Sequence, residues 1–275
     1  TDVATLTLVD IKTRATLSND SDLVILGANE DVDATLDITA QGDLTVDGAI
    51  NTTAANTATE NAIELTSGGD MIFNFSTSAT DAAATITLDA GGAIVDTATA
   101  ANSQINAVNL EIIDAASIGA STADDALDID VTNLTVAGAG STAAVSGDSY
   151  ISEADGLTIT STVTDGGISI TSTTGDVTLT SMTTSDDSVS VTATTGTLTV
   201  ATVAAGTGNV TLEATAAALA DDGAATLISG GLVTLTSGVS IGAADAMDTA
   251  ATQLAAHATG AGAVVITEED GVELL

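Results

Sequence analysis

Clusters of aspartate are the residues of this sequence best suited to chemistry. Carboxylate oxygens are preferred ligands of Ca²⁺, and these clusters lie where turns or strand ends are expected, so calcium is the one cofactor that the sequence suggests. The predicted calcium ligands are Asp124, Asp125, Asp128, Asp130, Asp186, Asp187, Asp221 and Asp222. The alternative is a solvated acidic surface, because the chain has no EF-hand loop and lacks the glycine-aspartate nonapeptide of calcium-binding β-rolls.

Catalytic chemistry has little support in the sequence. His257 is the only histidine, and no nearby serine or aspartate completes a recognisable triad. Enzymes that cleave acidic polysaccharides hold their substrates with arginine, lysine and aromatic side chains. This chain has only Lys12 and Arg14 as basic residues. We therefore expect that the protein is not an enzyme.

Charge is the strongest compositional signal. Against two basic residues stand 38 acidic ones, which gives a formal net charge of −36. Nucleic acids and anionic membrane surfaces are bound by clustered Lys and Arg, so this balance excludes both as partners. No apolar run approaches the roughly 20 residues of a membrane-spanning helix, and we expect no membrane insertion. The absence of cysteine removes disulfides, structural zinc and thiol chemistry.

Short strands are the elements expected to position the aspartate clusters. A repeated five-residue unit in the sequence predicts them. Each copy has a glycine, a polar residue, and two aliphatic residues that flank a threonine. The copies are Gly42-Asp43-Leu44-Thr45-Val46, Gly175-Asp176-Val177-Thr178-Leu179, Gly196-Thr197-Leu198-Thr199-Val200 and Gly208-Asn209-Val210-Thr211-Leu212. Alternation with period two predicts a strand whose aliphatic residues face inward and whose threonine faces outward. The glycine supplies the preceding turn.

The spacing of aliphatic residues distinguishes a solenoid from a β-sandwich. Three rows recur at intervals of about 20 residues: Ile168, Val189, Val210; Leu157, Val177, Leu198; and Val163, Met182, Val203. A sandwich seldom holds one period over three rows. We therefore expect a single β-solenoid domain over residues 1–275, in which each coil lays down three strands directly above the previous three.

Three parts of the chain fit the period less well. Upstream, the first row continues irregularly through Leu36, Ile63, Ile86, Val108 and Leu127. The longer intervals predict loop excursions at 49–60 and 97–107. Within 213–259 the sequence is Ala-rich and helix-compatible in places, which predicts an excursion or a terminal cap.

One segment carries a resemblance to a known family. Residues 168–181, Ile-Ser-Ile-Thr-Ser-Thr-Thr-Gly-Asp-Val-Thr-Leu-Thr-Ser, resemble repeats of filamentous-haemagglutinin-type bacterial adhesins. The likeness is best over 155–212. It implies an all-β fold, a right-handed parallel β-helix that is three-sided with about 20 to 22 residues per coil. It also implies export to the bacterial cell surface and a role as a stalk or adhesive fibre without catalytic residues.

Two structural functions follow from this reading. The first is an extracellular stalk or filament-forming segment of a surface adhesin, with end-to-end self-association and a host or cell-surface receptor as partners. The second is a surface-layer lattice protein assembled with calcium, which the Ala, Thr, Gly and Asp bias favours. The two differ in whether copies assemble into sheets that a chelator dissolves.

Overall fold

The computed structural model describes most of the chain, and every element in the described part is a β-strand. The described residues are 5–8, 16–19, 22–25, 28–30, 36–52, 62–80, 83–97, 105–122, 125–137, 144–223 and 227–275. All described pairings between strands are parallel, for example β5 with β8 and β18 with β20. The chain is therefore an all-β parallel β-solenoid, as the period predicts. Its coil of about 23 residues is slightly longer than the 20 to 22 expected. Among the described residues, no helix is long and apolar enough to cross a membrane.

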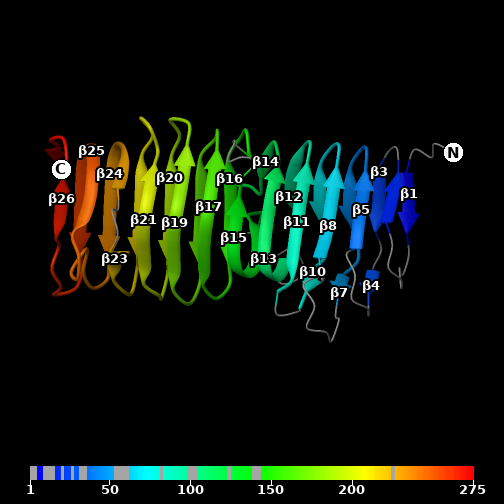
Figure 1. The fold of residues 1–275 in the computed structure, drawn as a ribbon, viewed down its shortest axis with the longest axis horizontal. Helices are drawn as coiled ribbons and strands as arrows, with labels where there is room; N and C mark the ends of the chain where they lie inside the picture. The colour runs from blue at the N-terminus through cyan, green and yellow to red at the C-terminus, as the bar shows by residue number, and fades with distance from the viewer. Residues whose placement is uncertain are drawn as a thin grey trace. The chain divides into compact units, whose positions relative to one another are not determined.

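Two compact units divide the chain, Thr1–Ile151 and Ser152–Leu275. In each unit, strands of successive coils lie side by side (Figure 1). We call such a series of paired strands a ladder, and residues in register along it a column. That residues 1–275 form one domain stays a prediction.

The first unit contains three ladders. The strands of one ladder are β2 (Thr16–Asn19), β5 (Leu36–Ala40), β8 (Ala62–Ser67), β11 (Thr85–Ala90) and the second halves of β13 (Ile105–Asp114) and β15 (Leu127–Val136). Those of the next are β1 (Thr5–Leu8), β3 (Asp22–Ile25), β6 (Leu44–Val46), β9 (Met71–Phe73), β12 (Ala93–Asp96) and β14 (Ser117–Ile118). Those of the third are β4 (Ala28–Glu30), β7 (Ile50–Thr52), β10 (Thr77–Ala79) and the first halves of β13 and β15.

The second unit also contains three ladders, and β16 (Ser149–Glu153) crosses the boundary in sequence. Their strands are β17 (Leu157–Thr164), β18 (Ile168–Ser172), β19 (Val177–Thr184), β20 (Val189–Ala193), β21 (Leu198–Ala204), β22 (Val210–Ala214), β23 (Leu219–Asp221), β24 (Leu227–Ser237), β25 (Met247–Ala258), β26 (Ile266–Glu268) and β27 (Glu273–Leu274). The long strands β17, β19, β21, β24 and β25 bend at a corner and so take part in two ladders.

Two of the three predicted rows are confirmed as columns. Ile168, Val189 and Val210 are in register, as are Leu157, Val177 and Leu198, and all six side chains are buried. These columns of Val, Ile and Leu fill a narrow core without large aromatic side chains.

The third predicted row is wrong by one residue. Met182 pairs with Thr162, not with Val163, and then with Val203. Thr162 is fully buried, whereas Val163 is half-buried on the outer side. The cause is the corner in β17, where Thr160 and Ser161 both face outward and shift the alternation by one position.

The same corner explains an error upstream. Leu36, Ile63 and Ile86 are in register with one another, but Leu110 follows Ile86, and Leu134 follows Leu110. The strand of Ile168, β18, pairs instead with β16, and β16 pairs with β14, so the prediction that this column continues the row of Ile168 is wrong. The predicted members Val108 and Leu127 are therefore wrong. Val108 and Asn109 both face outward at the corner of β13, and Leu127 lies in the first half of β15, which belongs to the neighbouring ladder.

The predicted irregular regions have different outcomes. Of the excursions expected at 49–60 and 97–107, residues 53–61 and 98–104 lie outside the described part, while 50–52 form β7 and 105–107 begin β13. The described residues of the Ala-rich segment 213–259 continue the coil through strands β22 to β25 and form no helix. That this segment serves as a terminal cap stays a prediction. Here the ladder overrides the helix propensity of alanine, since Ala214 and Ala251 occupy buried strand positions.

Candidate functional site

At four turns, the polar residue after the turn glycine links one coil to the next. In the first unit, the Asp43 carboxylate accepts the backbone N–H of Asp70 at 2.9 Å, and these residues are 27 positions apart. The Asp70 carboxylate in turn accepts the N–H of Ala93 at 2.8 Å, 23 positions further on. A carboxylate that accepts backbone N–H groups satisfies donors that the turn leaves unpaired.

The second unit repeats this arrangement. The carboxylate of Asp176 accepts the N–H of Thr197 at 2.8 Å, and the side-chain oxygen of Asn209 accepts the N–H of Leu232 at 3.2 Å. The repeated polar position is visible in the sequence. Its role as a hydrogen-bond acceptor for the next coil is visible only in the structure, where the coils stack. We call these side-chain-to-next-coil hydrogen bonds the turn links.

Glycine before the turn link is required by close approach. A Cβ atom added to Gly69 would lie 2.2 Å from the Asp43 carboxylate oxygen, and one added to Gly92 would lie 2.3 Å from that of Asp70. At Gly196 the added Cβ would lie 1.7 Å from the carbonyl oxygen of Gly175. Backbone from successive coils therefore packs with no room for a side chain.

Two of the predicted calcium-binding pairs make hydrogen bonds within their own turns and to neighbouring coils. Asp186 has a φ of 65° and accepts the N–H of Thr207 at 2.8 Å, and the carbonyl oxygen of Asp187 accepts the Thr184 hydroxyl at 2.6 Å. Asp221 accepts the N–H of Gly223 at 2.7 Å through one oxygen.

The backbone N–H of Asp222 donates to the carbonyl of Val200 at 3.2 Å. Asp187 and Asp221 thus form hydrogen bonds within their own turns, whereas Asp186 and Asp222 form hydrogen bonds to a neighbouring coil. Calcium binding by these two pairs stays a prediction.

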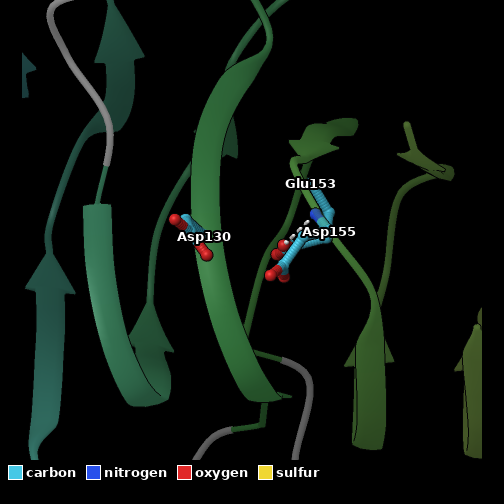
Figure 2. Close-up of side chains that lie close together, drawn as sticks. All are labelled: Asp130, Glu153 and Asp155. Atoms are coloured by element: carbon cyan, nitrogen blue, oxygen red, sulfur yellow. Dashed lines mark hydrogen bonds between the residues drawn. The ribbon is translucent and has the colours of Figure 1, made fainter. Parts of the chain in front are cut away.

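The remaining predicted ligands lie around the start of β15, except Asp124, which is outside the described residues. Asp125 is exposed and accepts a hydrogen bond from the Thr122 hydroxyl. The backbone N–H of Asp128 donates to the buried carboxylate of Asp96 at 3.3 Å. Asp130, which Figure 2 shows on β15, accepts the side-chain amide of Asn106 at 3.0 Å. Metal binding by these residues also stays a prediction.

Glu153 is a buried carboxylate that the sequence analysis missed. Its side chain is completely buried at the end of β16. One oxygen accepts the N–H of Ala154 at 2.9 Å and that of Asp155 at 3.2 Å, and Figure 2 shows Glu153 beside Asp155. Inward facing follows from alternation in β16, where Ser149 and Ile151 are also buried. The sequence signal for this position is its spacing of two residues from Ile151, although the residue type alone would place a glutamate at the surface.

An acidic hollow on the outer face of the first unit was also missed. Its volume is about 360 Å³, and its acidic lining residues are Glu64, Asp89 and Glu111. A register shift after Leu88 makes Ile113 an extra residue, which is exposed and also lines the hollow. In register, Glu64 and Glu111 both flank Thr87, so the two carboxylates are two coils apart.

The electrostatics of the acidic hollow disfavour ionisation. Partial burial, and second the negative charge of Asp114, raise the pKa of Asp89 above its ordinary value. The described residues that line the hollow include three carboxylates and no basic side chain. Chemically, the arrangement can attract cations, and hard divalent ions match its oxygen donors.

His257 takes no part in these arrangements. It lies exposed near the end of β25 and pairs in register with Thr236.

Comparison with protein-family models, with curated proteins and with solved structures found no match for this chain. The resemblance to filamentous-haemagglutinin-type repeats therefore stays a prediction from the sequence.

Proposed function

We propose that this chain is a non-catalytic structural protein of the bacterial cell surface, a stalk or filament-forming segment of an adhesin. The turn links carry this proposal. Each of them joins a side chain to the backbone of the following coil, in addition to the strand pairing and the apolar columns. Three kinds of interaction thus serve cohesion between coils, which a load-bearing segment requires.

The outer surface supports the same function. Outward positions carry columns of hydroxyl side chains such as Thr158, Thr178 and Thr199. With a net charge of −36, neighbouring copies repel one another sideways, which opposes lateral aggregation of parallel sheets.

The mechanical part of the proposal is tested by pulling single molecules from both ends. We expect extension in steps that each release about one coil, roughly 80 Å for 23 residues at about 3.5 Å per residue. Asp176→Ala removes one turn link and lowers the force of a step, whereas Asp176→Asn keeps an acceptor oxygen and serves as the control. A chain that extends as easily as an unfolded polypeptide would refute a load-bearing role.

Location and lack of catalysis need their own tests. Antibodies against the chain should label intact cells of the source organism, and labelling only after lysis would contradict a surface location. The purified chain should leave a panel of neutral and acidic glycans uncleaved. Turnover of any of them would overturn the non-catalytic part of the proposal.

A surface-layer lattice assembled with calcium is the second candidate, and the acidic hollow favours it. Cations held by Glu64, Asp89 and Glu111 would offset repulsion between copies. Electron microscopy should then show two-dimensional sheets in calcium that dissolve in chelator. Replacing all three carboxylates by amides should prevent the sheets, whereas Asp245→Asn, in an exposed turn, should not. Isolated chains in both buffers would reject the lattice.

A further inference from the structure

Two successive coils of the first unit, residues 36–52 and 62–80, pair with each other in all three ladders. In the first ladder (β5 and β8) and the second (β6 and β9), four inward-facing pairs are apolar and buried. These pairs are Leu36 with Ile63, Ile38 with Leu65, Leu44 with Met71 and Val46 with Phe73. The turn link from Asp43 to Asp70 joins the same coils at the turn between these two ladders. Apolar contacts and a turn link therefore hold the coils together here.

The third ladder of the same two coils is weaker. Its strands, β7 and β10, have three residues each. Their inward-facing pairs are Ile50 with Thr77 and Thr52 with Ala79. Thr52 and Thr77 are completely buried, and neither hydroxyl has a hydrogen-bond partner among the described residues. Each inward-facing pair thus contains a buried hydroxyl that makes no hydrogen bond, which weakens the pairing relative to an apolar pair of the same shape.

Hydrogen bonds on the two sides of β7 also differ. At the corner before β7, the side-chain amide of Asn74 donates to the Asp47 carboxylate at 3.1 Å, and the backbone N–H of Asn74 donates to the carbonyl of Val46 at 2.9 Å. After β7, the N–H of Thr80 donates to the carbonyl of Thr52 at 3.3 Å, which is longer than the usual range of about 2.7–3.2 Å. The two coils are thus held firmly at the corner and more weakly beyond it.

We propose that the third ladder between these coils is a hinge, at which β7 separates from β10 while the other two ladders stay paired. Local opening begins where few apolar groups are buried and hydrogen bonds are weakest. When one of three ladders opens, the following coil tilts about the corner of Asp47 and Asn74, and the first unit bends there. The hinge lets a stalk bend under a sideways load without loss of its coils, and this use of it rests on the proposed structural function.

Hydrogen exchange of the whole chain, followed by nuclear magnetic resonance, tests the hinge directly. The amides of Leu44 and Ile50 are a matched pair, because both donate to the following coil, to the carbonyls of Asp70 at 2.9 Å and Ser76 at 3.0 Å. Leu44 belongs to the second ladder and Ile50 to the third. After correction for intrinsic rates, the Ile50 amide should exchange at least about tenfold faster than the Leu44 amide. Equal exchange of the two amides would overturn the hinge.

Removing the two hydroxyls without partners should keep the hinge closed. The double variant Thr52→Val, Thr77→Val keeps the shape of both side chains, so it should slow exchange of the Ile50 amide at least about tenfold and leave that of Leu44 unchanged. Thr45→Val is the matched control, because Thr45 lies on β6 of the same coil and faces outward. It should change neither amide, and circular dichroism should show that all variants keep their β-structure. An Ile50 amide that exchanges as fast in the double variant as in the unchanged chain would overturn the inference.

An engineered disulfide tests the movement itself. The chain has no cysteine, so two introduced cysteines can pair only with each other within one molecule. Asn51 and Ser78 are register partners on the outer side of β7 and β10, and the spacing of about 4.8 Å between neighbouring strands suits a disulfide. In Asn51→Cys, Ser78→Cys, oxidation should slow exchange of the Ile50 amide, and reduction should restore it. Equal exchange in both forms would also overturn the hinge.

The hinge and the stalk function can fail separately. A chain that resists pulling, but whose Leu44 and Ile50 amides exchange equally, would refute the hinge and leave the stalk function intact. A chain whose Ile50 amide exchanges faster, but which extends as easily as an unfolded polypeptide, would keep the hinge and refute the load-bearing role.

Discussion

Separate substitutions of Thr162 and Val163 test which of the two residues faces the core. In the structure it is Thr162, whereas the spacing of aliphatic residues in the sequence favours Val163. Thr162 is fully buried, and its hydroxyl has no hydrogen-bond partner among the described residues. Valine has nearly the same shape without the hydroxyl. A buried hydroxyl without a partner costs about 1–3 kcal/mol, so Thr162→Val should stabilise the fold by about that amount.

Val163 serves as the matched control. It faces outward and is half-buried, so Val163→Thr should change stability by no more than about 0.5 kcal/mol. For a chain of this size, about 1 kcal/mol corresponds to roughly 2–4 °C in melting temperature. Thr162→Val should therefore raise the melting temperature by about 2–12 °C, and Val163→Thr should leave it almost unchanged. Circular dichroism during heating measures both.

The opposite result would refute this reasoning. If Val163 faced the core, Val163→Thr would bury a hydroxyl and lower the melting temperature, while Thr162→Val would have little effect. That outcome would restore the third row as the sequence predicts it and remove the corner shift in β17.

Three further predictions concern the contacts between coils and the acidic hollow. In urea denaturation, Gly196→Ala should destabilise the fold by more than Gly223→Ala, because an added Cβ at Gly196 meets backbone at 1.7 Å, whereas at Gly223 it meets nothing within 4 Å and only the φ of 79° strains the alanine, at a cost of about 1–2 kcal/mol; a loss at Gly196 no larger than that at Gly223 would contradict close packing. Asp176→Ala should speed hydrogen exchange at the Thr197 amide, whereas Asp176→Asn should preserve its protection; unchanged exchange in Asp176→Ala would argue against the turn link. The pKa of Asp89 is higher in the folded state than its ordinary value of 3.8, so the folded protein binds this proton more tightly than the unfolded chain does. The resulting gain in folding stability is complete below pH 3.8 and is lost as the pH rises through the pKa of the folded state. Asp89→Asn should therefore raise the melting temperature at about pH 7 and change it little at about pH 3, and a lower melting temperature at about pH 7 would reverse the sign of this argument.

The sequence predicts the fold well where aliphatic residues mark both the spacing and the phase of each strand. Ile168, Val189 and Val210 are such residues, and their column is correct. Corners cannot be predicted in this way. At Thr160 and Ser161 two successive residues face outward, and in a run of Thr, Ser and Val no residue type marks the shift.

The candidate sites were harder to predict than the fold. Adjacent aspartates in the sequence suggested ligand clusters, but the structure shows Asp186 and Asp221 bound to backbone N–H groups. The acidic hollow joins Glu64 and Glu111 from different coils, and its shape depends on the extra residue Ile113. Which acidic residues of different coils lie close together depends on the length of each coil and on register shifts such as the one after Leu88. Neither can be inferred from adjacent aspartates in the sequence.

The direction of the turn links bears on how the protein forms during synthesis. Asp43, Asp70 and Asp176 each accept a hydrogen bond from a residue that is made later. When a coil leaves the ribosome, its acceptor oxygen is thus already present for the amide of the coil that follows. A nascent chain can therefore fold one coil at a time from the N-terminus, each finished coil acting as the template for the next.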